Sequence, residues 1–289
     1  MLSDRPAVQA VHEVLSKHGV TVDRCEVLQD GSTLVLRLAE TLVARVVQDR
    51  EGPREGLDWF VRENVVVEHL TRTGAPVIPL HPALPPGPHE CRGFPMSFWR
   101  YVTVTGRAPD AHEAGRALGV CHAALATLEA PMPKLAILHE SLGILRERAL
   151  FPEETTALLS WHLEESLRRL QDGHHQILHG DAHFGNVLDT TEGLLWTDWE
   201  DAFLGPVEWD VASLIWNAKL LDDDQATVEA VMNGYQAAGG KMDASLIQQC
   251  LKARAAVMCA WYPLLYPNPD AVRAEKLKQR LDWLAVIGP

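Results

Sequence analysis

The sequence lacks the cysteine patterns of disulfide-bonded and zinc-binding proteins. Its five cysteines are an odd number, and no two of them form a Cys-x-x-Cys pair. Such paired spacings are the usual sign of a disulfide framework or of a zinc ion held by cysteines. We therefore expect free thiols and a reducing, cytoplasmic location.

A segment suited to a lipid bilayer is also missing. The longest apolar run, from Ala255 to Tyr266, contains Pro263 and is shorter than the roughly 20 residues that span a membrane. The N-terminal residues MLSDRPAVQA carry no basic stretch followed by an apolar one, as a signal peptide would. We expect neither export nor association with a membrane.

Positive charge is scarce in this chain. The 289 residues include 26 Lys and Arg against 39 Asp and Glu, which gives a formal net charge of −13. Because nucleic-acid binding depends largely on neutralising phosphates, this balance argues against a nucleic-acid partner. Most of the excess acid lies beyond residue 99, where it favours a small cationic ligand. The oligomeric state is left open.

The pattern of apolar residues differs between two parts of the chain. Residues 25–47 alternate or are β-branched, which predicts three antiparallel strands, and residues 93–104 predict a fourth. The proline-rich segment 76–90 predicts a surface loop, and residues 187–199 predict a strand, a turn and a strand. Helical periodicity predicts helices over 3–18, 53–73, 110–128, 138–150, 153–171, 207–220, 225–238, 243–262 and 271–284.

This order of elements predicts an α+β protein with two lobes. A small antiparallel sheet with one main helix comes first, and a larger, mainly helical region follows. We place the N-terminal lobe at residues 1–99 and the C-terminal lobe at residues 100–289.

The segment ILHGDAHFGNVL, residues 177–188, carries the most informative polar side chains. Asp181 and Asn186 lie between two apolar ends that predict buried strands. On a loop between such strands, a carboxylate can accept a hydroxyl proton while a carboxamide oxygen binds a hard cation. Asp198 follows another apolar run and is a second candidate oxygen ligand.

These residues resemble the motif of the aminoglycoside phosphotransferase and choline kinase family, which shares the bilobal fold of protein kinases. Protein kinases carry H-R-D-x-x-x-x-N followed by D-F-G, whereas this chain has H-G-D-A-H-F-G-N and then Asp198-Trp199-Glu200. Glycine in the second position is typical of the small-molecule kinases. The resemblance implies that Asp181 is the catalytic base and that Asn186 and Asp198 bind Mg²⁺.

The resemblance extends to the N-terminal part through less specific matches. Arg45, on the third predicted strand, stands where the family has its phosphate-binding cation, and Arg37 on the preceding strand is a rival for this role. Arg45 replaces the lysine of protein kinases, so a planar fork replaces a point charge. Glu63 in the next helix is the expected ion-pair partner of Arg45, and Val43 is expected to cover the adenine.

Two loops complete the implied nucleotide site. Residues 29–33, including Ser32, are expected to cover the phosphates, although the family's glycine-rich loop is reduced here to a single glycine. Residues 98–102 are expected to form the hinge that reads adenine, with Trp99 and Tyr101 in contact with it. The choice between ATP and GTP is left open.

The resemblance implies an enzyme that moves the γ-phosphoryl group of ATP, with Mg²⁺, to a hydroxyl of a small molecule. The acidic C-terminal region favours an amine-bearing acceptor, such as an aminoglycoside or an amino alcohol, although Asp222 to Asp224 fit a helix N-terminus better than an acceptor site. Two alternatives remain: a nucleotide-binding protein of the same fold without catalysis, and a zinc-dependent hydrolase that uses His179, Asp181 and His183.

Overall fold

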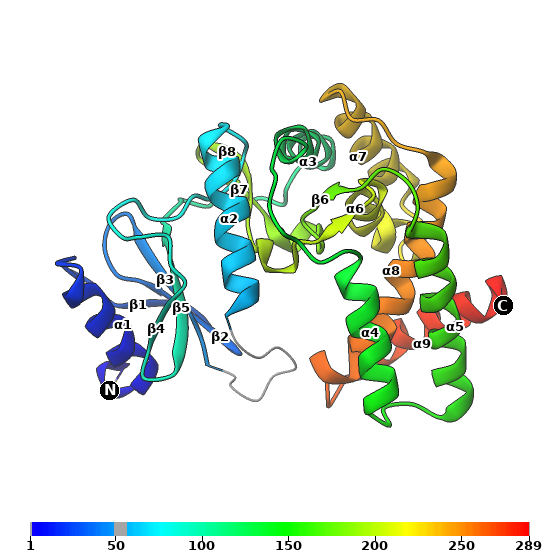
Figure 1. Ribbon diagram of the computed structural model, residues 1–289, viewed down its shortest axis with the longest axis horizontal. Coiled ribbons are helices and arrows are strands. Elements are labelled where there is room, and N and C mark those ends of the chain that lie inside the picture. Colours follow the sequence, from blue (N-terminus) through cyan, green and yellow to red (C-terminus); the bar gives the residue numbers. More distant parts are fainter. Residues whose placement is uncertain (1, 49–56, 289) are drawn as a thin grey trace. The chain divides into compact units, whose positions relative to one another are not determined.

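The computed structural model describes residues 2–48 and 57–288 (Figure 1). The first residues of the helix predicted over 53–73, residues 53–56, lie outside the described ones. The chain divides into two compact units: Met1–Ala108 with Leu188–Glu200, and Pro109–Val187 with Asp201–Pro289. The lobes 1–99 and 100–289, placed from the order of the predicted elements, stay a prediction. Their limits differ from those of the units.

A five-stranded antiparallel sheet forms the centre of the first unit, with strand order β1-β2-β3-β5-β4. The strands are β1 (Glu26–Asp30), β2 (Thr33–Arg37), β3 (Leu42–Val47), β4 (His89–Cys91) and β5 (Phe94–Arg100). The four strands predicted from alternation are present. The segment expected as a loop ends in β4, because the chain there pairs back onto β5.

Two helices pack with this sheet. Ala44 and Val46 of β3 share one hydrophobic core with Val11 of α1 (Pro6–Lys17), which follows a short 3-10 turn (Leu2–Asp4). Arg45 lies between these two residues and points to the other face, because side chains alternate along a strand. There it contacts Glu63 of α2 (Asp58–Arg72).

A hairpin that is distant in sequence also belongs to the first unit. β7 (Val187–Thr190) and β8 (Gly193–Trp196) form the strand–turn–strand predicted for this region. The backbone N–H of Trp196 donates to Pro76, and its carbonyl accepts from Ile78, at 2.9 and 3.0 Å. The 3-10 turn Trp199–Asp201 follows, so Asp198 lies at the end of a strand that is anchored to this unit.

The second unit is mainly helical, and each helix predicted for it is present. Its helices are α3 (Ala111–Leu125), α4 (Ala136–Glu147), α5 (Glu153–Leu170), α6 (Glu208–Leu220), α7 (Gln225–Ala237), α8 (Ala244–Leu265) and α9 (Ala271–Ile287). α8 contacts α4, α5, α6 and α9 and is the centre of this unit (Figure 1). It continues past Pro263, beyond its predicted end, because the buried Trp261 and Tyr262 hold the last turn.

A two-stranded pair, β6 (Gln176–Ile177) with β9 (Leu204–Gly205), and the 3-10 turn Phe184–Asn186 complete the second unit. A sheet-based first unit and a helical second unit confirm the predicted α+β class. None of the helices in the described residues has the length and hydropathy needed to cross a bilayer.

Candidate functional site

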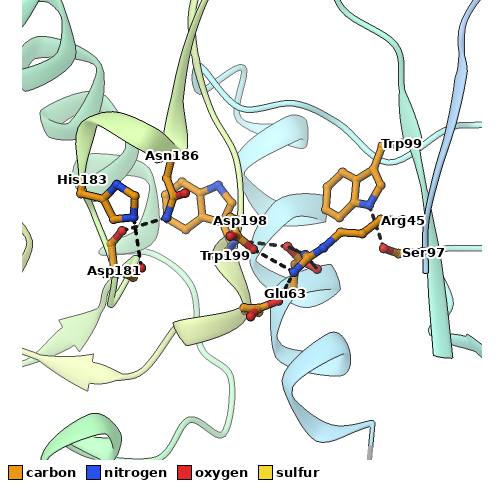
Figure 2. A network of polar contacts seen from close by, with 10 residues as sticks. Arg45, Glu63, Ser97, Trp99, Asp181, His183, Asn186, Asp198 and Trp199 are labelled. Carbon is orange, nitrogen blue, oxygen red and sulfur yellow. Dashed lines mark hydrogen bonds and ion pairs between the residues drawn. The ribbon is translucent and has the colours of Figure 1, made fainter. Parts of the chain in front are cut away.

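Arg45 contacts three carboxylates within the first unit (Figure 2). Its Nη1 donates to both carboxylate oxygens of Glu63, at 3.0 Å each. Its Nη2 lies 3.0 Å from Oδ1 of Asp198 and also contacts Glu200. The predicted ion pair between Arg45 and Glu63 is present, and Glu63 also accepts from the backbone N–H of Trp199 at 3.2 Å.

Negative charge outweighs positive charge in this group. Burial would lower the pKa of Arg45, but the charges of Asp198, Glu63 and Glu200 raise it well above its ordinary value. Burial raises the pKa of Glu63 in spite of Arg45, and the neighbouring carboxylates raise it further. The guanidinium therefore stays charged, while the surrounding carboxylates favour a further cation or a proton.

Asp198 fits a divalent cation. Its Oδ1 is buried and accepts no hydrogen bond, although Nη2 of Arg45 lies 3.0 Å away. Its φ of 66° places a non-glycine residue in the left-handed region, a strain that clusters at functional sites. Carboxylate oxygen is a preferred ligand of Mg²⁺. The residues present thus fit the predicted metal site on the side of the first unit.

The other residues predicted to bind nucleotide also belong to the first unit. Val43 and Trp99 are cross-strand partners on β3 and β5, and both are buried. Nε1 of Trp99 donates to Oγ of Ser97 at 2.7 Å. Ser32 is exposed in the turn between β1 and β2. Their roles toward a nucleotide stay predictions.

Arg37, the rival of Arg45, has other partners. Its guanidinium carbon lies 3.6 Å from the ring centroid of Tyr101, and its Nη2 donates to the carbonyl of Glu40 at 3.2 Å. The ring of Tyr101 is therefore covered by a cation. The contacts of Arg45 with Glu63 on α2 and with Asp198 after β8 distinguish it from Arg37.

In the second unit, Asp210 of α6 holds the loop that carries Asp181. Asp210 is fully buried and accepts from the backbone N–H groups of His179 and Gly180, at 2.7 and 3.0 Å. Its Oδ2 also lies 2.9 Å from Nε2 of His122. A single buried carboxylate therefore fixes the backbone of this loop.

The glycine before Asp181 has a steric cause. Gly180 has a φ of 87°, and a Cβ there would lie 2.0 Å from the carbonyl oxygen of Asp201. Both the positive φ and this short distance exclude a side chain at position 180. The glycine that distinguishes this motif from that of protein kinases is therefore required by local packing in this chain.

Both carboxylate oxygens of Asp181 are engaged, and Figure 2 shows the contact with His183. Oδ1 contacts Nη2 of Arg254 on α8, and Oδ2 lies 3.3 Å from Nε2 of His183. Burial would raise the pKa of Asp181, but the charge of Arg254 and the contact with His183 hold it well below its ordinary value. Asp181 is therefore an ionised carboxylate at neutral pH.

Asn186 lies on the same loop as Asp181. Its Nδ2 donates to the backbone carbonyl of Asp181 at 3.0 Å, which leaves its Oδ1 as the oxygen that can face a cation. This arrangement fits the metal-binding role predicted for Asn186. Asp181 and Asn186 belong to the second unit and Asp198 to the first, and their common action on one ligand stays a prediction.

The H-x-D-x-H spacing does not form a zinc site. Nδ1 of His179 is 3.4 Å from the backbone N–H of Asp181, and Nδ1 of His183 accepts from the N–H of Gly185 at 2.9 Å. Over residues 2–48 and 57–288, no three His, Cys, Asp or Glu side chains are grouped as metal ligands. The structure gives the zinc-hydrolase alternative no support.

The chain matches one protein family and resembles solved structures of small-molecule kinases. The family described as "Phosphotransferase enzyme family" matches residues 14–244. An amicoumacin kinase solved with AMP-PNP, Ca²⁺ and Ami has 13% identity, 96% coverage of this chain, 94% of that chain and a TM-score of 0.72. Choline kinase LicA from Streptococcus pneumoniae has 14% identity, 95% coverage of this chain, 98% coverage of that chain and a TM-score of 0.66. At such identities the likeness shows the fold. No curated protein sequence matches the chain.

Proposed function

The chain belongs to the phosphotransferase enzyme family, and from this membership we propose that it moves the γ-phosphoryl group of Mg·ATP to a hydroxyl of a small molecule. Membership makes it an enzyme of the small-molecule kinase class, and it confirms the family resemblance drawn from residues 177–200. The nucleotide, the metal and the acceptor are parts of the proposal.

The observation that carries the proposal is the ionised carboxylate of Asp181 on a loop fixed by Asp210. Oδ2 of Asp181 would orient the acceptor hydroxyl. The acceptor oxygen forms a bond to the γ-phosphorus, and the bond from that phosphorus to the β,γ-bridging oxygen breaks, so ADP leaves. The hydroxyl proton passes to Asp181 and then to water. Because such transition states are loose, alignment contributes more than the strength of the base.

Asn186 and Asp198 would hold Mg²⁺ through side-chain oxygens. When bound, the ion neutralises charge on the phosphate oxygens. The amicoumacin kinase was solved with AMP-PNP and Ca²⁺, which supports a nucleotide and a divalent cation as ligands of this fold. The side chain of Asp198 is 40% exposed although its Oδ1 lies against Arg45, so the carboxylate can still reach a ligand, which supports the same assignment in this chain.

The nucleotide would lie against residues 1–99. Arg45 would contact the phosphates from a position fixed by Glu63. The residues assigned to the remaining nucleotide contacts are Ser32 at the phosphates and Val43, Trp99 and Tyr101 at the adenine. Residues 100–289 would supply catalysis and the acceptor site. The five free cysteines support a cytoplasmic location, where ATP is available.

The proposal is tested by measuring phosphoryl transfer from Mg·ATP to a panel of aminoglycosides, choline, amino alcohols, sugars and macrolides. We expect turnover with the wild type, and a loss of about 10²–10⁴-fold in kcat for Asp181→Asn and Asp198→Asn with the fold intact. Asp224→Asn is the matched control, because asparagine replaces aspartate as the N-cap of α7 at little cost.

Full transfer activity in Asp181→Asn would refute the assignment of the base. Binding of Mg·ATP by the wild type, without transfer to any acceptor or to water, would support the catalytically silent alternative instead.

A further inference from the structure

Arg254 is a buried arginine in the middle of α8. It is 7% exposed, and its guanidinium carbon lies 5.7 Å from the ring centroid of Trp216 on α6. Its Nη2 contacts Oδ1 of Asp181, and Asp181 is the one carboxylate that it contacts among the described residues. The guanidinium is thus held between two helices and faces the loop that carries Asp181.

Burying this guanidinium is costly for the fold. A buried charge needs compensation from a partner, and well-packed apolar side chains are often at least as stable as an ion pair. The compensation here is incomplete, because Nε of Arg254 is buried and has no hydrogen-bond partner. Stability alone therefore does not explain the arginine, whereas its fixed contact with Asp181 does.

The two carboxylate oxygens of Asp181 have different partners. Arg254 contacts Oδ1 from the protein interior, whereas Oδ2 lies 3.3 Å from Nε2 of His183, whose side chain is 37% exposed. The carboxylate is therefore fixed at one oxygen and reaches toward the solvent side with the other. An acceptor hydroxyl must meet such a carboxylate in one orientation for in-line transfer.

We propose that Arg254 is a positioning residue, which holds Oδ1 of Asp181 and thereby presents Oδ2 to the acceptor oxygen. This inference rests on the proposed function. Arg254 itself touches neither substrate. Loss of its guanidinium should lower kcat and leave the affinity for nucleotide unchanged, because the nucleotide contacts are assigned to other residues.

Arg280 of α9 offers a matched control. It is 5% exposed, and its guanidinium carbon lies 4.5 Å from the same Trp216 ring. It donates to Oδ1 of Asn217, at 3.5 Å, and no ion pair with a carboxylate is found for it among the described residues. Arg280→Gln thus removes a buried guanidinium from the same ring without touching Asp181.

The experiment uses water as the acceptor, so that it does not depend on the identity of the natural acceptor. Phosphate release from Mg·ATP is measured for the wild type, Arg254→Gln, Arg254→Lys, Arg280→Gln and Asp181→Asn, and folding is followed by circular dichroism. We expect Arg254→Gln to lose about 10²-fold in kcat, a typical cost of misalignment, with KM for ATP within about twofold. Arg254→Lys should recover part of kcat, and Arg280→Gln should keep most of it.

Chemical rescue separates positioning from folding. Millimolar guanidinium should raise kcat of Arg254→Ala and should not raise that of Arg280→Ala or Asp181→Asn. Equal kcat values for the folded Arg254→Gln and Arg280→Gln variants would overturn the inference, as would a wild-type kcat in Arg254→Lys, which keeps the charge but lacks the planar fork.

Failure of the inference and failure of the proposed function give different results. If Asp181→Asn is inactive and Arg254→Gln is normal, the inference alone is wrong. If Asp181→Asn keeps wild-type phosphate release, the assignment of the base is wrong and the role of Arg254 falls with it.

Discussion

Asp210 fixes the functional loop of the second unit with one side chain. Two backbone N–H groups and a histidine converge on its carboxylate, which is fully buried. Hydrogen bonds to a charged acceptor are stronger than neutral ones, and a buried donor left without a partner costs the full desolvation of that donor. The position of Asp181 therefore depends on a residue that does not touch the proposed substrates.

Asp210→Asn should lower both stability and turnover. The asparagine keeps the shape but turns an amide NH₂ toward at least one donor, so we expect the free energy of unfolding to fall by about 2–4 kcal/mol. Urea denaturation measures this change, and Mg·ATP turnover of the folded fraction measures the displacement of Asp181. Asp243→Asn is the control, since Asp243 caps α8 and asparagine caps a helix equally well. An Asp210→Asn protein as stable as this control would contradict the argument.

The motif residues and Arg254 differ in what a sequence can indicate about them. Asp181, Asn186 and Asp198 are recognisable because their spacing along one segment is fixed by the loop and hairpin they occupy. Arg254 is separated from Asp181 by 73 positions, and its neighbours on α8 are apolar. Its contact exists only because α8 packs beneath the loop, which no local pattern encodes.

Two helices of the second unit, α3 and α7, approach each other closely through glycines. A Cβ at Gly115 would lie 2.1 Å from the carbonyl oxygen of Val231, and one at Gly234 would lie 1.9 Å from that of His112. The opposing atoms belong to backbone and cannot rotate away. Gly143 on α4 differs, because a Cβ there meets nothing within 4 Å.

Replacing Gly143 and Gly234 with alanine should have opposite effects on the free energy of unfolding. Alanine favours a helix over glycine by about 0.5–1 kcal/mol. We expect Gly143→Ala to gain about this amount, whereas Gly234→Ala should lose about 1–3 kcal/mol through overpacking. The midpoints of urea unfolding measure both changes. Equal stabilisation of the two variants would show that α3 and α7 are not in close contact at Gly234.

His162 connects α5 to α9 and should make stability depend on pH. It is 3% exposed, and its Nε2 lies 3.0 Å from the carbonyl oxygen of Leu284. Burial lowers its pKa, in spite of that contact, so the native protein takes up this proton at lower pH than the unfolded chain. The free energy of unfolding should therefore be highest above pH ~6.5 and fall as the pH drops below it.

The matched variant for this prediction is His162→Gln, which keeps a side-chain donor and cannot titrate. Denaturation curves between pH 7.5 and 5.5 should show a shallower fall for the variant than for the wild type, by at most about 1.4 kcal/mol per pH unit. Identical slopes would assign the pH dependence to other groups.

Local patterns predict the helices and the longer strands, and β2, for example, buries every second residue. The N-cap expected near Asp222 to Asp224 is present, since Asp224 accepts from the N–H of Thr227 at 3.0 Å. The two-residue strands β6 and β9 show no periodicity of their own, because they exist through pairing with each other. The apolar end at Ile177 predicts β6 before the Asp181 loop, whereas sequence reasoning misses its partner β9.

At the scale of the whole molecule, the residues assigned to the proposed function come from both units. The carboxylates around Arg45 lie in the first unit, and Asp181 with Asn186 lies in the second. Each group is specified by the elements of its own unit, and the proposed function is that one nucleotide with a metal ion binds to both groups.

Removal of the metal should therefore reduce the stability that the nucleotide confers. A ligand at 100 times its Kd adds about 2.7 kcal/mol to the free energy of unfolding, which corresponds to a rise of several degrees in Tm for a chain of this length. We expect Mg·ATP to raise the Tm, and ATP with EDTA to raise it much less. Asp198→Asn should lose the difference between the two conditions, and Asp224→Asn should keep it. An equal shift with and without Mg²⁺ in the wild type would show that Asp198 and Asn186 do not hold the metal with the nucleotide.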